Sequence, residues 1–325
     1  MALSSLYPQI KHYVVRDIAY SIREVIRVLD RGGRLNELFD LKEFKKIQDE
    51  IYELYNKDAA MVLFLNDILQ QEGQERYYEV LRKENTKFKQ ALILSETIVR
   101  SKNNLQIVRH GIWIQVNPEY AVDAKRRLYI NCQPEYINHV VNYLATYLAQ
   151  GHAKYIFKFP DANSIRLNAP AELVRADKLV IYYENDAQTH EFLIKILQTL
   201  RHYLRIDVPL FTHKIENGIA FAYEPPPEVH EYVQEHTGER ASFGMFMALV
   251  IARYLQAWVV AHRRCPDCKE RLPVGAMVCP RCGAPVAQRR ADMHDIPNEQ
   301  EIKTIAEEIF TFKLKQRHNF QFEPR

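Results

Sequence analysis

Apolar residues near the start of the chain recur at the spacing of one helix face. The first run consists of Val14, Ile18, Ile22, Val25 and Leu29. Because three or four residues make one turn of an α-helix, this spacing predicts a helix, and the glycines at positions 32 and 33 are suited to end it. The same periodicity predicts helices over residues 41–55, 59–71 and 88–99. We therefore expect a helical N-terminal region over residues 1–104.

From about Leu105 the pattern changes to short runs rich in β-branched and aromatic residues. These runs predict strands over residues 112–116, 127–131, 154–159, 178–183, 208–214 and 219–223. The helices predicted between and after them span residues 134–150, residues 188–204, and a run from Ser242 to about Val260. Asn217-Gly218 separates the last two strands. Both residues tolerate positive φ, so we expect a tight hairpin there.

Four of the five cysteines form two Cys-x-x-Cys pairs. The pairs are Cys265 with Cys268 and Cys279 with Cys282, and ten residues separate them. Four thiolates at this spacing fill the tetrahedral shell of a zinc ion and leave no position for water, so the pattern predicts a structural Zn²⁺. An iron–sulfur cluster is the alternative. Cys132 stands alone, which fits a reducing compartment better than a disulfide framework.

The chain is expected to have four parts. These are the helical region, an α+β domain over residues 105–261, a zinc ribbon over residues 262–290, and a C-terminal helix and tail over residues 291–325. The last helix is expected to begin near Asn298, and alternating apolar residues over 310–314 predict a strand after it. The fold class is therefore α+β: a helical N-terminal region, a mixed sheet with flanking helices, a small zinc ribbon and a C-terminal helix.

Composition and charge narrow the classes of function. The 325 residues are 47% hydrophobic and 26% charged, as in a folded protein, and the formal net charge is only +3. A general nucleic-acid binder is usually more basic. The longest uncharged apolar stretch, residues 245–252, is too short to cross a bilayer, and residues 1–10 lack the features of a signal peptide. We expect a soluble, cytoplasmic protein without a membrane partner.

The predicted ribbon is locally basic. Its charged residues are Arg263, Arg264, Lys269, Arg271, Arg281, Arg289 and Arg290 against Asp267 and Glu270. Such a patch can hold the phosphates of a nucleic acid. No aromatic residues alternate with the basic ones, as a base-stacking surface would require. Nucleic acid therefore stays an alternative partner, and a peptide or protein is the main one.

Basic residues also recur on neighbouring predicted strands of the middle domain. Alternate residues of a strand share a face, so Arg127 lies with Tyr129, and Lys154 lies with Lys158. Arg175 precedes the next strand, and the pair His213-Lys214 lies in the predicted hairpin. Cations repeated in this way predict a groove that binds phosphate.

The order of several short motifs resembles the HopA-type effector family. The motifs are Arg127-Leu-Tyr-Ile-Asn131, Ile156-Phe-Lys-Phe159, Arg175-Ala-Asp-Lys-Leu-Val-Ile-Tyr182, Pro209-Leu-Phe-Thr212, Gly218-Ile-Ala-Phe-Ala-Tyr-Glu-Pro225 and Ser242-Phe-Gly244. The family takes its name from a type III effector of a plant pathogen and includes lyase-like components of class V lanthipeptide biosynthesis. The resemblance spans roughly residues 105–255 and does not include the ribbon. It implies elimination of phosphate from phosphothreonine or phosphoserine in a peptide.

The resemblance also implies roles for individual residues. Lys158, in its neutral form, is the candidate base that removes the Cα proton. Arg127, Arg175 and Lys214 are the candidates that hold the phosphate, because cationic groups match its oxygens. Better understood phosphothreonine lyases carry Lys-x-His where this chain has Arg127-Leu-Tyr129, so Tyr129 becomes the candidate acid, with His213 as a substitute.

Two other functions stay open at this point. The first is a non-catalytic module that binds a phosphopeptide or a protein and uses the ribbon for docking. The second is a zinc-ribbon protein associated with nucleic acid. Three further residues of the motifs, Glu224, Ser242 and Gly244, are expected to have structural roles: the end of a strand, a helix cap and a close packing contact.

Overall fold

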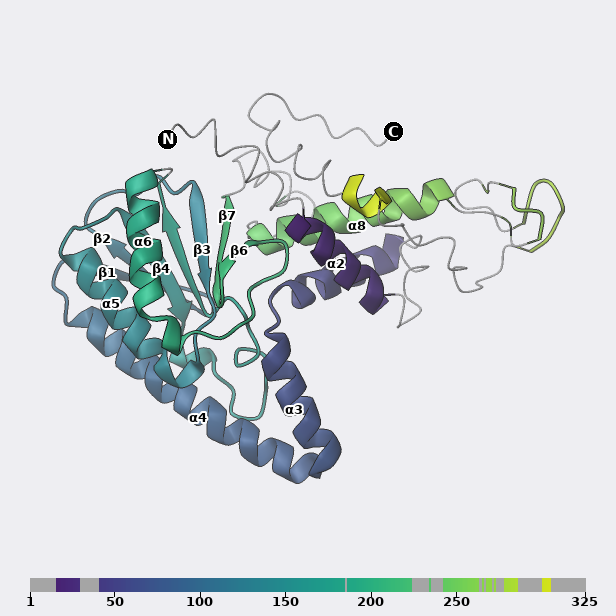
Figure 1. The fold of residues 1–325 in the computed structure, drawn as a ribbon. Coiled ribbons are helices and arrows are strands. Elements are labelled where there is room, and N and C mark those ends of the chain that lie inside the picture. The colour runs from purple at the N-terminus through teal and green to yellow at the C-terminus, as the bar shows by residue number, and fades with distance from the viewer. Residues whose placement is uncertain are drawn as a thin grey trace. The chain divides into compact units, whose positions relative to one another are not determined.

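The computed structural model describes residues 16–29, 41–184, 186–223, 234, 242–262, 265, 267–270, 272, 278–285 and 300–304. The chain forms two compact units, one of residues 56–224 and the other of residues 1–55 with 225–325. This division differs from the four parts expected, because the helices over residues 59–100 belong to the unit that holds the sheet. The α+β class is confirmed (Figure 1).

The unit of residues 1–55 and 225–325 is helical in its described part, apart from the residues around the four cysteines. It contains a helix over residues 16–29, α2 (Leu41–Tyr55), α8 (Phe243–His262) and helical residues 300–304. Ser242 caps α8, since its Oγ accepts a hydrogen bond of 3.1 Å from the Met245 N–H, as predicted. Gly244 has the expected packing role, because a Cβ there would run into the ring of Tyr55 on α2. Glu224 and residues 310–314 lie outside the described part.

The unit of residues 56–224 is built on a seven-stranded sheet. Its strands are β1 (Leu105–His110), β2 (Trp113–Pro118), β3 (Arg126–Ile130), β4 (Tyr155–Pro160), β5 (Leu179–Tyr183), β6 (His213–Glu216) and β7 (Ile219–Tyr223), in the order β1-β2-β4-β5-β3-β7-β6. Every pairing is antiparallel, where a mixed sheet was expected. Strands β3 and β4 do run in the same direction, but β5 returns between them and pairs with both.

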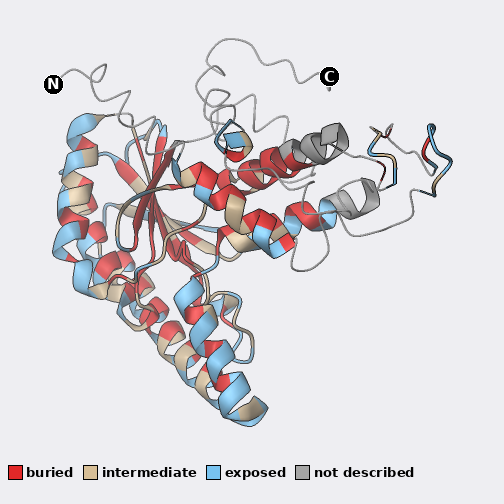
Figure 2. Ribbon diagram, turned by 45° about the vertical axis from the view of Figure 1, so that its right-hand side comes forward, coloured by how far each residue is buried: buried red, intermediate tan, exposed pale blue. Residues whose placement is uncertain are grey.

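Helices cover one face of this sheet (Figures 1 and 2). They are α4 (Gly73–Arg100), α5 (Ile137–Ala149) and α6 (Ala187–Thr199), while α3 (Ala59–Gln71) packs on α4. Short 3₁₀ turns lie at Pro134–Tyr136, Ala162–Ser164 and Arg201–Tyr203. Their apolar stripes join alternate residues of the strands, such as Val116, Phe157 and Leu128, in one buried core. Two buried tyrosine hydroxyls on this face bond α5 and α6: Tyr155 to the Leu144 carbonyl and Tyr183 to His190.

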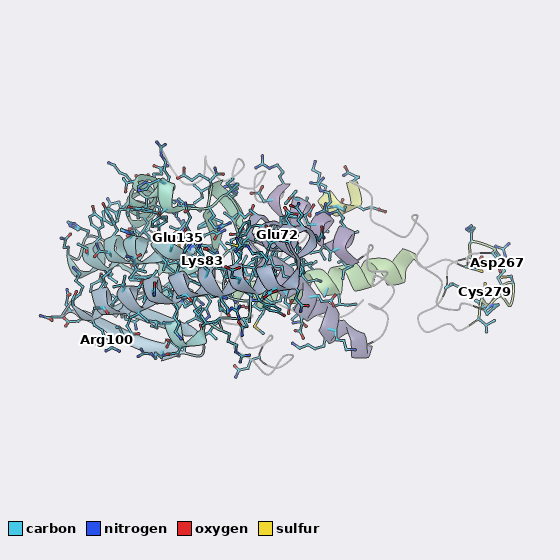
Figure 3. All side chains as sticks on the ribbon, turned by 90° about the horizontal axis from the view of Figure 1, so that it is seen from below. Glu72, Lys83, Arg100, Glu135, Asp267 and Cys279 are labelled. Carbon is cyan, nitrogen blue, oxygen red and sulfur yellow. The ribbon has the colours of Figure 1, made fainter. Side chains whose placement is uncertain are left out.

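Helix α4 begins fifteen residues before the helix predicted over residues 88–99. Glu72, Lys83 and Arg100 mark its course from one end to the other (Figure 3). Its first half buries few apolar side chains, which is why its periodicity is weak, and side-chain ion pairs along the helix, such as Arg76–Glu79 at 2.7 Å, support it instead.

The strand predicted over residues 208–214 is wrong in its first half, since β6 begins only at His213. Pro209 has no N–H to give to a neighbouring strand. Phe211 adopts φ +64, and the Thr212 hydroxyl bonds the Pro209 carbonyl, so this segment is a turn. The predicted hairpin is confirmed: Gly218 has φ +69, and a Cβ there would lie 2.6 Å from the Arg205 carbonyl oxygen.

Candidate anion-binding face and metal centre

The candidate residues of the middle domain fall on both faces of the sheet. Residues that pair directly across strands share a face, so the registers define the face opposite the helices, called the second face below. Its residues include Trp113, Gln115, Lys158, Val180, Tyr182, Arg127, Tyr129, Ala220, Ala222 and Lys214. On β3 and β7, and at Val180 of β5, these side chains are buried, whereas Trp113, Gln115, Lys158 and Tyr182 are half-buried.

Three candidate cations meet at two aromatic rings of the second face. The Lys158 Nζ lies 4.4 Å from the ring centroid of Trp113 and 5.5 Å from that of Tyr182. The guanidinium of Arg127 lies 4.9 Å from the Tyr182 centroid, and that of Arg175 lies 5.0 Å from the Trp113 centroid. Cations favour the electron-rich faces of aromatic rings, so Trp113 and Tyr182 hold together charges that would otherwise repel each other.

Arg175 is positioned from its other side by two carboxyl groups. Its Nε and Nη2 both donate to Asp177, at 2.9 Å each, and its Nε lies 3.7 Å from the Glu172 Oε2. A two-pronged bond of this kind fixes the plane of a guanidinium. Asp177 is 6% exposed and the Glu172 side chain 15%, so the arrangement is largely shielded from water.

The other candidates lie farther away or on the opposite face. Tyr129 and Lys214 share one row across the sheet with Lys158, two and four strands from it, or roughly 10 and 19 Å at the usual strand spacing. Lys214 is exposed, and its Nζ donates to the Ile206 carbonyl. His213 pairs with Phe221, a residue of the helix-covered core, so its side chain is on the face opposite Lys158.

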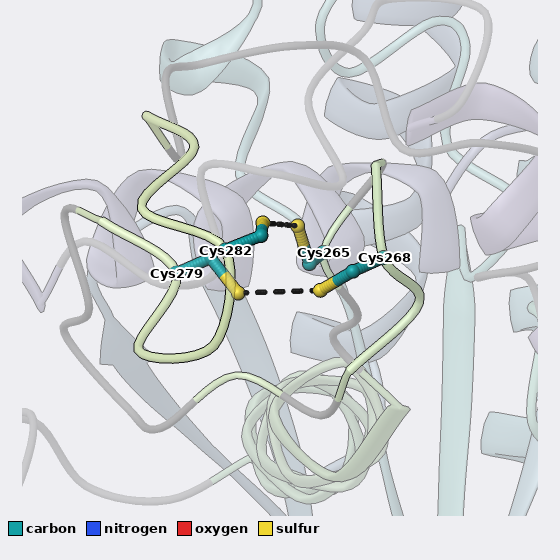
Figure 4. A group of neighbouring side chains, drawn as sticks. All are labelled: Cys265, Cys268, Cys279 and Cys282. Carbon is teal, nitrogen blue, oxygen red and sulfur yellow. Dashed lines mark hydrogen bonds between the residues drawn. The ribbon is translucent and has the colours of Figure 1, made fainter.

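The four ribbon cysteines form the cluster predicted from their spacing (Figure 4). Their sulfur atoms all lie within 4.8 Å of one another, and the Cys265–Cys282 and Cys268–Cys279 pairs are 3.5 Å apart. Zinc–sulfur bonds of about 2.3 Å give a tetrahedron with edges of about 3.8 Å, so the donor set fits a zinc ion.

The two Cys-x-x-Cys turns have the same backbone geometry. In each, the residue after the second cysteine has positive φ, +58 at Lys269 and +72 at Gly283, and its N–H bonds the carbonyl of the first cysteine at 2.9 Å. Cys265 and Cys279 are buried. Arg281 forms a 2.9 Å ion pair with Glu270, so the two turns are also linked at their surface. The ribbon's other arginines lie outside the described residues.

Comparison with known proteins identifies the middle of the chain. Residues 106–264 match the model of the HopA1 effector protein family. This matched segment is called the HopA1 segment below. The match begins in β1 and ends just beyond α8, and it therefore contains the whole second face. It stops short of Cys265, so the metal cluster lies outside the HopA1 segment.

Two solved effector structures from Pseudomonas syringae are similar to this chain. The effector from pathovar tomato strain DC3000 is 16% identical, with a TM-score of 0.40 over 57% of this chain and 82% of that one. The effector from pathovar syringae strain 61 is 13% identical, with a TM-score of 0.37 over 66% of this chain and 93% of that one. No curated protein matches the chain. No helix in the described ranges has both the length and the apolar character to cross a membrane.

The HopA1 segment also shares a buried charge network with α3 that sequence reasoning missed. The Lys178 Nζ donates to the Asn131 Oδ1 at 2.9 Å and to the Arg175 carbonyl, and it lies 3.7 Å from Asp58. Asp58 also accepts from Arg205 at 2.7 Å. Burial lowers the pKa of Lys178 to about 8. Burial alone would raise the pKa of Asp58, but the nearby cations and hydrogen bonds outweigh this effect and leave that pKa below its usual range.

Two aromatic residues of the HopA1 segment, Trp113 and Tyr182, were also missed as parts of the site. The sequence indicates only on which face of a strand each ring lies, because Trp113 alternates with the apolar residues of β2 and Tyr182 with those of β5. The alternation shows that each ring faces away from the helix-covered core. Only the strand order shows that both rings lie next to Lys158.

Proposed function

We propose that the second face of the HopA1 segment binds a phosphothreonine or phosphoserine peptide and eliminates its phosphate. The observation that carries the proposal is the meeting of Lys158, Arg127 and Arg175 at the rings of Trp113 and Tyr182. Three cations gathered at the same two rings, Lys158 and Arg175 half-buried and Arg127 buried, form a site that a phosphate dianion can neutralise.

The proposed reaction needs a base on one side of the phosphate and cations around it. Neutral Lys158 takes the proton from Cα, the electron pair of that bond forms the Cα=Cβ double bond, and the Cβ–O bond breaks. The phosphate leaves with the bonding electrons and its bridging oxygen. Arg127 and Arg175 stabilise the departing charge. Lys214 is too far from Lys158 to contact the same phosphate, so we give it no part in this step.

The test is a mass measurement on phosphothreonine peptides incubated with the full chain. Elimination removes one phosphoric acid per site and leaves a dehydroamino acid. Lys158→Ala should lower kcat by roughly 100-fold or more, the usual contribution of a general base. The matched control is Lys154→Ala, an exposed lysine four residues earlier in the chain, which should leave turnover unchanged. An equal fall in kcat in both variants would contradict the assignment of Lys158 as the base.

A second candidate function is phosphopeptide binding without catalysis. It is favoured by the placement of the expected acids, because Tyr129 is only 2% exposed and His213 faces the helix-covered side. Titration calorimetry with phosphorylated and unphosphorylated forms of one peptide separates the two functions. Phosphate-dependent binding that weakens in Arg127→Gln, with no product by mass, would support the binding module.

For the cysteine cluster we propose one structural Zn²⁺. The support is the donor set itself, four sulfur atoms at tetrahedral spacing with the apolar Leu272 packed beside them. Metal analysis of the purified chain should give about one zinc per chain, and Cys279→Ser should lower that value. A brown protein that contains iron would instead indicate an iron–sulfur cluster.

A further inference from the structure

The proposed elimination lacks a proton donor for the departing oxygen among the residues expected from the sequence. Tyr129 lies roughly 10 Å from Lys158 by strand spacing and is almost fully buried. His213 is on the opposite face. A group that protonates the leaving phosphate has to lie near the cations that hold it, so the surroundings of Arg175 are the place to search.

Glu172 is such a group. It lies in the segment between β4 and β5, and its side chain is 15% exposed. Its Oε2 is a buried atom that has no hydrogen-bond partner among the described residues, and it lies 3.7 Å from the Arg175 Nε. Asp177 already takes both hydrogen bonds from that side of the guanidinium. A carboxylate left in this position, without donors of its own, is stabilised by carrying a proton.

Burial outweighs the nearby cations at Glu172. Burial raises the pKa of Glu172 above its usual value, and the carboxylate of Asp177 raises it further, whereas Arg175 and Lys178 lower it. The net direction is upward. Two carboxyl groups therefore share one guanidinium but differ in environment: Asp177 accepts the two-pronged bond of Arg175, and Glu172, which accepts none, retains its proton to higher pH. A pair separated in this way is the arrangement that acid–base catalysis uses.

We propose that Glu172 donates the proton that the leaving phosphate takes up. The inference rests on the proposed elimination at Lys158. In that step Lys158 gains the Cα proton, the Cβ–O bond breaks, and the bridging oxygen takes the proton of Glu172. The products are the dehydroamino acid, hydrogen phosphate, protonated Lys158 and the Glu172 carboxylate. Solvent then returns a proton to Glu172 and removes one from Lys158, so no further reactant is needed.

The experiment compares wild type with Glu172→Gln and Glu172→Asp on one phosphothreonine peptide. The amide keeps the shape of the side chain but has no acidic proton, and aspartate keeps the acid on a shorter stem. We expect kcat of Glu172→Gln to fall roughly 100-fold or more with KM within about twofold, and Glu172→Asp to recover part of the loss. In wild type, kcat should fall at high pH as Glu172 loses its proton, and this alkaline limb should be absent in Glu172→Gln.

The possible results separate the inference from the function on which it rests. If wild type turns over and Glu172→Gln changes KM more than kcat, or retains the alkaline limb, Glu172 only positions Arg175 and the assignment is wrong, while the lyase proposal stands. If wild type gives no product on any peptide, the lyase proposal fails and the assignment fails with it. If Glu172→Gln does not fold, Glu172→Asp decides. Partial activity with normal peptide binding and a shifted alkaline limb supports the proton donor, and an unchanged alkaline limb refutes it.

Discussion

Replacing Asp58 tests how much the buried charge network stabilises the unit of residues 56–224. The side chains of Asp58 and Lys178 are both 0% exposed, and that of Arg205 is 21% exposed. Asp58 also caps α3, since its Oδ1 accepts from the Met61 N–H at 3.0 Å, and its Oδ2 accepts from Asn131 at 3.0 Å. Asp58→Asn removes the charge and keeps a side chain that can cap a helix, whereas Asp58→Ala removes both.

The expected losses follow from these contacts. Asp58→Asn takes away the buried carboxylate that lies 3.7 Å from the Lys178 Nζ, and breaking a buried ion pair at one partner destabilises by about 3–5 kcal/mol. Asp58→Ala should lose about 1 kcal/mol more, the usual value of a helix cap. The double variant Asp58→Asn with Lys178→Met removes both buried charges. It should recover most of the loss, because apolar replacement of a whole buried pair is often close to neutral.

The assay is urea unfolding followed by circular dichroism, with the free energy of unfolding obtained by linear extrapolation. Asp67→Asn, at an exposed position of α3, is the matched control and should change the free energy by less than about 0.5 kcal/mol. A loss below about 1 kcal/mol in Asp58→Asn would refute the reasoning. So would a double variant whose loss equals the sum of the two single losses, because the two charges would then act independently.

Three other measurements test separate parts of the structure. Burial lowers the pKa of Lys178 from 10.5 to about 8, so between pH 8 and pH 10.5 the unfolded chain binds more protons than the folded chain. The free energy of unfolding of wild type should therefore rise relative to that of Lys178→Met as pH rises from about 8 to 10.5. Parallel curves of this free energy against pH would contradict the prediction. Gly218→Ala should lose more stability than Gly111→Ala in urea unfolding, since both have positive φ but only Gly218 meets neighbouring atoms, and equal losses would rule out the close contact. Removal of the metal by a chelator should speed amide hydrogen exchange at Cys265 and Cys279 and leave β3 and β5 unchanged, whereas faster exchange in the strands would place the metal's effect elsewhere.

Much of the local structure was predictable from the sequence because it depends on neighbouring residues. The predicted ranges of α2, α3 and β7 agree with the structure, and the four cysteines cluster as their spacing required. The errors also have local causes. The first half of α4 carries too few apolar residues for its period to be recognised, and Pro209 with Phe211 turns an apparent strand into a loop.

The sequence by itself determined which side chains could carry chemistry: the cysteine pairs, and the alternation that puts Arg127 and Lys158 on strand faces. Tertiary structure decided which of them meet. Lys158, Tyr129 and Lys214 share one row across the sheet, but the strand order puts Tyr129 and Lys214 two and four strands away from Lys158. Because neighbouring residues of a strand point to opposite faces, the register of β6 puts His213 on the face opposite Lys214. In the buried network, Asp58 contacts Lys178 and Arg205, which are more than a hundred residues away in the sequence. No local sequence pattern predicts such a contact, because the charged groups meet only when the chain has folded around them.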